Sequence, residues 1–151
     1  MKSVKQRLLD HIQAHDTLQH QHEILTSIVG IGDSSAARVL AEIDSIEHFQ
    51  SAQQLVAFAG LTPQEHESGT SVWGKTRLCK IGNCRLRKTL YFPALHLMRR
   101  CPQMQGFCER LLAACKTKMQ VVGVVRLQVT FAMHQDLLAV RSERIVMPPM
   151  L

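Results

Sequence analysis

Hydrophobic residues recur at helical spacing along most of the chain, and this pattern predicts a mainly helical, all-α fold. The first stripe, Val4, Leu8, Ile12 and Leu18, predicts one helix over residues 4–25 that is too thinly apolar to be buried without a partner helix. Further helices are expected after the turn Gly30-Ile31-Gly32, from Ser51 to Gly60, from Asn83 through Leu97, from Pro102 to about Lys116, and over residues 119–140.

Residue types at the ends of these segments sharpen the boundaries. Asp33 or Ser34 can cap the helix that buries Ala37, Val39, Leu40 and Ile43; Ser51 and Asn83 cap two later helices; and Pro93 should kink the helix in which it lies. The valine-rich stretch 119–140 is too long for one strand, so a buried helix is expected despite its β propensity.

The glycine turn near residue 30 resembles a helix-hairpin-helix motif. Gly30 and Gly32 would let the backbone approach a DNA phosphate, and the start of the next helix attracts anions. Val29 stands where the motif usually has proline. An αα-hairpin that serves only for packing explains the same pattern about equally well.

Positive charge is concentrated in one part of the chain. The formal net charge is +6, but residues 68–108 contain eight Lys and Arg and no acid, so the remainder is slightly acidic. Residues 64–78 lack a helical period, and Gly69 and Gly74 flank four residues, so a loop or short β-hairpin is expected there. The concentration of positive charge in residues 68–108 favours a polyanion as partner, while an ordinary solvated basic face is the alternative.

The cations just after Asn83 are the best evidence from charge alone for a phosphate site. Arg85, Arg87 and Lys88 lie in the first turns of the expected helix, where the helix dipole disfavours positive charge. A bound phosphate would reverse the sign of that interaction.

Histidine and cysteine give no metal motif. The pair His11 and His15 has i,i+4 spacing, but a solvated helix face is the better interpretation because no Glu follows the first His. Cys101, Cys108 and Cys115 recur every seven residues on an apolar helix face, and we expect them to pack there. With five cysteines in no framework spacing, and no signal peptide or membrane segment, a reducing, cytoplasmic compartment is expected.

A family likeness rests on several motifs in order. Residues 25–91 resemble the C-terminal serine domain of the DEDD-type insertion-sequence transposases, the bridge-RNA-guided recombinases. The motifs are Ser27-Ile28-Val29-Gly30-Ile31-Gly32, Phe58-Ala59-Gly60-Leu61-Thr62-Pro63, Ser68-Gly69-Thr70-Ser71-Val72, Arg77-Leu78-Cys79-Lys80 and Gly82-Asn83-Cys84-Arg85-Leu86-Arg87-Lys88.

The resemblance implies a domain order. Residues 1–24 would be the end of a linking helix, residues 25–140 the serine domain and residues 141–151 a tail. The family's N-terminal RuvC-like domain with its DEDD metal cluster has no counterpart here, so Mg²⁺ is expected only with that domain and no metal ligand is assigned in this chain. The Pro-Pro tail and Arg126-Leu127-Gln128 depart from the family pattern, which leaves a truncated remnant as an alternative.

The resemblance also implies a site. Ser68 would attack a DNA phosphodiester and form a phosphoserine intermediate; its alternative role is that of a turn serine. The residues expected to bind DNA or phosphate are Gly30, Gly32, Ser71, Lys75, Arg77, Lys80, Asn83, Arg85, Arg87 and Lys88.

The sequence thus predicts the DNA-binding, catalytic-serine domain of a transposase, incomplete on its own. The implied partners are DNA, a guide RNA, a protomer that carries the acidic domain, and further copies of the chain. A non-enzymatic helix-hairpin-helix protein that binds nucleic acid is the rival interpretation.

Overall fold

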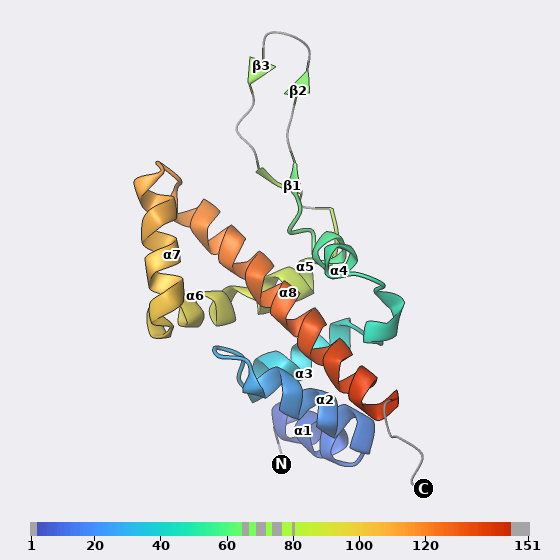
Figure 1. Cartoon of the computed structure of the whole chain (residues 1–151). Coiled ribbons are helices and arrows are strands. Elements are labelled where there is room, and N and C mark those ends of the chain that lie inside the picture. Colours follow the sequence, from blue (N-terminus) through green and yellow to red (C-terminus); the bar gives the residue numbers. More distant parts are fainter. Residues whose placement is uncertain (1–2, 65–66, 69–71, 74–76, 80, 146–151) are drawn as a thin grey trace, which may run out of the picture.

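The computed structural model describes residues 3–64, 67–68, 72–73, 77–79 and 81–145 of the 151-residue chain. The described chain is mainly helical, which confirms the predicted fold class, and one narrow projection stands out from the helices (Figure 1). Its helices are α1 (Val4–Gln13), α2 (Asp16–Ser27), α3 (Asp33–Glu42), the short 3-10 helix η1 (Ile46–His48), α4 (Ala52–Phe58), α5 (Cys84–Thr89), α6 (Tyr91–Arg100), α7 (Pro102–Ala113) and α8 (Lys118–Ile145).

The prediction of one helix over residues 4–25 is wrong, because the chain turns back at Ala14 and His15 to give α1 and α2. Asp16 opens α2, where a carboxylate is favoured by the helix dipole. Folding back lets α1 pack on both α2 and α3, and it buries Ile12 and Leu25. One straight helix could not bury its thin apolar stripe in this way.

The predicted N-cap is wrong for α3 and confirmed for α4. Gly32, not Asp33 or Ser34, is the N-cap of α3, and its helix begins at Asp33 without a side-chain cap. Ser51 caps α4 as predicted by accepting a hydrogen bond from Gln54 N at 3.4 Å. Gly60 follows α4 with φ +67°, a left-handed conformation that favours glycine.

Pro93 divides its segment more sharply than predicted. Instead of one kinked helix, α5 ends at Thr89, Leu90 forms a turn, and α6 begins at Tyr91. Proline has no N–H to donate to the carbonyl four residues earlier, so the helical ladder is interrupted before it.

Helix α7 ends three residues earlier than expected, and this breaks the cysteine stripe. Cys108 is buried and Cys101 is half-buried, but Cys115 is exposed with φ +58° in the turn after the helix. The expectation that all three cysteines pack on one face is therefore wrong for Cys115.

Helix α8 is the common core element, and it confirms the buried helix predicted over residues 119–140. It contacts α2, α4, α6, α7 and η1 (Figure 1). Among the described residues, no helix is both long and apolar enough to span a membrane. The buried side chains of α8 include Val121, Val125, Val129, Met133 and Leu137.

The segment predicted as a loop or short hairpin contains two short antiparallel strand pairs. β1 (Pro63–Gln64) pairs with β4 (Arg77–Leu78), and β2 (Glu67–Ser68) pairs with β3 (Val72–Trp73). The β1/β4 pair lies next to the helices, and β2 and β3 stand farther out (Figure 1). We call residues 63–78 the hairpin, and β1 with β4 its stem.

Candidate functional site

Ser68 lies on the outer part of the hairpin. Its backbone belongs to β2, opposite Val72 of β3. Arg77 lies in the stem, opposite Gln64. Of the other predicted site residues in this region, Ser71, Lys75 and Lys80 lie outside the described residues. The strand pairing therefore places Ser68 on a projecting element rather than in the helical core.

The projection separates the two halves of the predicted site. Figure 1 shows β2 and β3 well away from α5, which carries Arg85, Arg87 and Lys88. Cations on α5 thus do not lie beside Ser68 in this chain.

The start of α5 is organised by two side chains. Asn83 is its N-cap, as predicted, and its Oδ1 accepts hydrogen bonds from Arg85 N at 2.9 Å and Leu86 N at 3.0 Å. The Asn83 amide also donates to Glu42 Oε2 at 2.7 Å, and Arg85 Nη1 lies 3.8 Å from Glu42 Oε1. The Glu42 carboxylate, at the end of α3, thus places a negative charge at the start of α5. The sequence pattern predicts a bound phosphate as the source of that charge.

Arg87 is directed into the protein, although the sequence grouped it with Arg85. Its Nη1 donates to the carbonyl oxygen of Ala59 at 3.0 Å. The adjacent Gly60 has no room for a side chain, because a Cβ there would meet Arg87 Nη1 and lie 2.9 Å from the carbonyl oxygens of Cys79 and Ile81. Arg87 therefore holds the turn between α4 and the hairpin stem.

Arg126 is a buried cation to which the sequence assigned no role. It lies on α8 with 8% of its surface exposed, donates through Nη1 to Arg87 O at 3.4 Å, and faces the Tyr91 ring at 5.4 Å. Its buried Nε has no hydrogen-bond partner among the described residues. Burial lowers the pKa of Arg126, and the nearby positive charge of Arg87 lowers it further.

A sequence signal for Arg126 existed. It falls on the apolar stripe of α8, four residues after Val122 and three before Val129, both of which are buried. A basic residue inside a helical apolar stripe is expected to be buried with its charge.

The glycine turn between α2 and α3 is shaped by packing. Gly30 has φ +99°, and a Cβ there would lie 2.7 Å from the carbonyl oxygen of Pro93 on α6. Gly32 is exposed with nothing near its Cβ position. The close approach of α6 accounts for Gly30 without DNA, whereas Gly32 remains open to a partner.

The other titratable groups form no evident centre. His11 and His15 are exposed, with ring centroids 4.7 Å apart. Within the described part of the chain, no group of three or more His, Cys, Asp or Glu residues lies close enough to hold a metal. Burial, and then the charge of Glu109, raise the pKa of the Cys108 thiol, so that it stays protonated at neutral pH.

The chain is similar to a gene-inverting protein, an insertion-element protein and a transposase. It is 34% identical over 120 residues to the pilin gene-inverting protein of Moraxella bovis, a match that covers 76% of this chain and 37% of that protein. It is 32% identical over 116 residues to a 43.6 kDa protein of insertion element IS110 from Streptomyces coelicolor (75% and 28%). A probable family 20 transposase of Pseudomonas aeruginosa is 34% identical over 115 residues (69% and 33%).

These matches span about a third of each relative's length. Residues 22–109, from α2 into α7, match the profile of the Transposase IS116/IS110/IS902 family. That match includes the glycine turn, the hairpin with Ser68, and all of α5. Because it covers more than half of the chain, this protein belongs to the Transposase IS116/IS110/IS902 family.

Proposed function

We propose that this protein binds DNA and supplies Ser68 as the nucleophile of a strand-transfer reaction. One relative is named a gene-inverting protein and another a transposase. Inversion and transposition both require DNA strands to be cut and rejoined. The serine assignment comes from the motif resemblance, and the observation that supports it is the position of Ser68 on a projecting hairpin, where a bulky duplex can reach its backbone segment.

The proposed step exchanges one phosphate ester for another. The Ser68 hydroxyl loses its proton to a base, and Oγ bonds to the phosphorus of a DNA phosphodiester. The bond from phosphorus to one deoxyribose oxygen breaks, and that oxygen takes up a proton and leaves as a hydroxyl group. The resulting phosphoserine ester conserves the bond energy for rejoining to a second strand.

The family resemblance implies that groups outside this chain help to activate Ser68. No metal-binding cluster lies among the described residues, and α5 is distant from β2. We infer that an acidic domain of the family, on the same or another polypeptide, supplies the base that takes the Ser68 proton. The negative charge that develops at phosphorus would be stabilised by cations, either basic side chains or a metal ion held by that domain. No step here is assigned to a metal held by residues of this chain.

The test is formation of a covalent protein–DNA adduct. Ser68→Ala should abolish the adduct on a denaturing gel when the acidic domain of a full-length family member is supplied, because no Oγ remains to form the ester. Thr70→Val, in the same motif, is the matched control and should retain it, because Thr70 is assigned no role in binding or chemistry. An adduct of undiminished yield with Ser68→Ala would rule out the assignment.

DNA binding without chemistry is the second candidate function. It is favoured by the exposed Arg85 and Lys88, which need no acidic domain to act. If Ser68→Ala and the native protein bind a duplex equally but neither forms an adduct with the acidic domain present, this second function is the correct one.

A further inference from the structure

Two helices bring exposed cations together at one edge of the molecule. Arg38 lies one turn before Glu42 on α3, and Glu42 contacts Arg85 of α5 at 3.8 Å. Arg85 and Lys88 lie three residues apart on α5, so they share a face. Arg38 and Lys88 are exposed, and the Arg85 side chain has 82% of its surface exposed.

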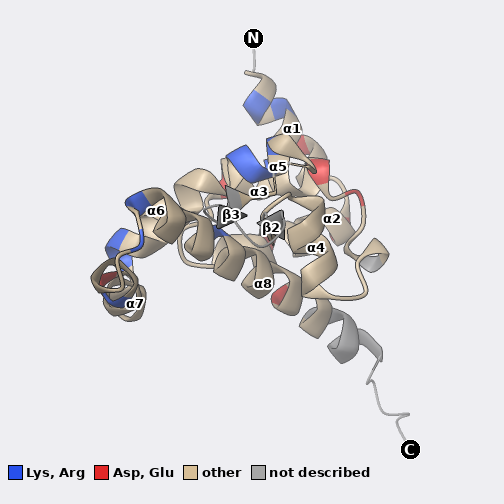
Figure 2. Ribbon diagram, turned by 90° about the horizontal axis from the view of Figure 1, so that it is seen from above, with Lys and Arg blue, Asp and Glu red and all other residues tan. Residues whose placement is uncertain are grey.

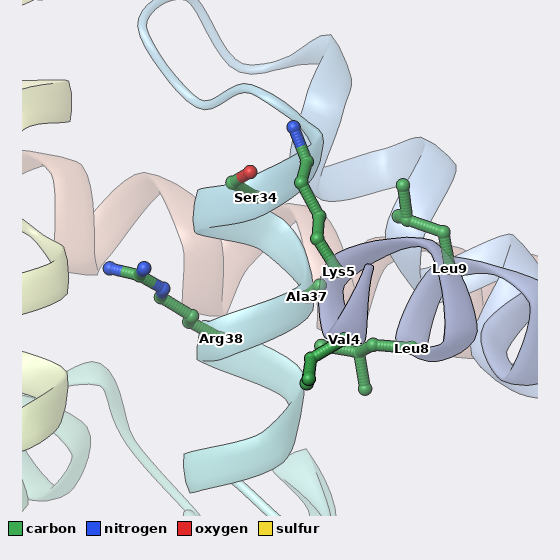
Figure 3. A pocket seen from close by; sticks show the side chains of 7 residues that line it. All are labelled: Val4, Lys5, Leu8, Leu9, Ser34, Ala37 and Arg38. Atoms are coloured by element: carbon green, nitrogen blue, oxygen red, sulfur yellow. The ribbon is translucent and has the colours of Figure 1, made fainter. Parts of the chain in front are cut away.

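Helix α1 adds a further cation to this edge. Lys5 and Arg38 line the same cavity of about 290 Å³, whose floor is made of apolar side chains from α1 and of Ala37. Figure 3 shows Lys5 reaching along α3 toward Ser34, whereas Arg38 points away from α1. The cations thus lie on both sides of α3 rather than at one point.

The charge balance of this surface is positive. Glu42, the carboxylate nearest Arg85, is only 21% exposed and is already bonded to the Asn83 amide. Asp33, at the start of α3, is exposed and lies 3.9 Å from His22, so four cations face two carboxylates. Figure 2 shows the basic positions of α1 and α5 on the same side of the molecule, and those of α6 and α7 on another flank. Cations spread over three helices match a row of phosphates better than one small anion.

We propose that Lys5, Arg38, Arg85 and Lys88, here called the α1/α3/α5 surface, bind the sugar-phosphate backbone of a DNA duplex. This inference rests on the proposed function and deepens it. Lys5 and Arg38 lie outside the basic segment 68–108 and far from it in sequence. The fold, not the sequence pattern, joins them to α5.

The experiment measures duplex affinity of the whole chain against salt concentration. The double variant Lys5→Gln/Arg38→Gln should weaken binding about ten-fold or more at 0.1 M salt and reduce the slope of log K against log[salt] by about two, because two phosphate contacts are lost. Arg99→Gln/Arg100→Gln on α6 removes the same charge from exposed positions on the other flank. This control should change both quantities much less.

Three outcomes would overturn the inference. Equal losses in the two double variants would mean that only net charge matters. An unaltered slope in Lys5→Gln/Arg38→Gln would mean that the surface does not contact DNA. Tighter binding of an RNA duplex of the same sequence, with the loss confined to RNA, would assign the surface to RNA. If the native protein binds no duplex at any salt concentration, the proposed function itself fails instead.

Discussion

Two pairs of arginines on neighbouring helices are used in opposite ways. Arg38 and Arg85 are exposed, and the Glu42 carboxylate lies between their helices. Arg87 and Arg126 are directed inward: Arg87 donates to the backbone carbonyl of Ala59, and Arg126 donates to that of Arg87. The first pair is available to a polyanion. The second pair links α5 to the end of α4 and α8 to α5.

This difference shows that density of positive charge in a sequence does not identify the residues that contact DNA. Arg85 and Arg87 are two positions apart on a helix, so their side chains must point in different directions. The inward pair brings two like charges close together in a poorly solvated place, which costs free energy that exposed cations do not incur.

The largest effect should come from filling the space beside Arg87. Gly60→Ala should lower the free energy of unfolding by about 3 kcal/mol or more, because a Cβ meets Arg87 and two carbonyl oxygens at a left-handed backbone position. Chemical denaturation monitored by circular dichroism measures it. If Gly60→Ala is as stable as the native protein, the turn at Gly60 is loosely packed. Arg87 would then not be the fixed, inward-directed residue that the comparison requires.

The next largest effect on stability should distinguish Arg87 from Arg85 on α5. Arg87→Ala should lower the free energy of unfolding by about 1.5–3 kcal/mol, because the Ala59 carbonyl loses a charged donor. Arg85→Ala should change it by less than about 0.5 kcal/mol, yet weaken duplex binding. Both variants need denaturation curves and duplex titrations. Equal stability losses would show that the two arginines are not used differently.

Substitutions of Arg126 measure how much its buried charge costs in folding free energy. The depressed pKa of Arg126 means that folding disfavours its charged form at neutral pH. Arg126→Met keeps most of the volume and should leave the free energy of unfolding unchanged or raise it by about 1 kcal/mol. Arg126→Ala should lower it by roughly 2 kcal/mol through the cavity it leaves. Similar losses in both variants would show that the charge itself is stabilising.

The smallest effect is expected at Gly106, a glycine with open surroundings that serves as the matched contrast to Gly60. Gly106 lies exposed within α7, and a Cβ there would meet nothing within 4 Å. Gly106→Ala should raise the free energy of unfolding by about 0.5–1 kcal/mol, since alanine loses less conformational entropy in a helix. A loss instead would indicate a contact of α7 that the structure does not show.

The sequence predicted most helices because their signals are local. Ser51, Asn83 and the stripe of α8 each act within a few residues, and each prediction was confirmed. The turn at Ala14 and His15 carries neither glycine nor proline, so only the packing of α1 on α3 defines it.

The candidate site was less predictable because its contacts are long-range. The links from Glu42 to Asn83 and from Arg87 to Ala59 span 41 and 28 residues. No local pattern reports which of two neighbouring arginines faces inward. The role of Ser68 came from resemblance, and it stays a prediction that adduct formation can test.

The position of α8 has a consequence for how the chain matures during synthesis. Helices α4, α6 and α7 all pack on α8, and all three emerge from the ribosome before it. The core side chains Val129, Met133 and Leu137 of α8 are made after the helices that they pack against. The nascent protein therefore exposes the apolar faces of these helices until α8 has been synthesised, and premature termination after residue 117 should yield a species prone to aggregation rather than a smaller folded domain.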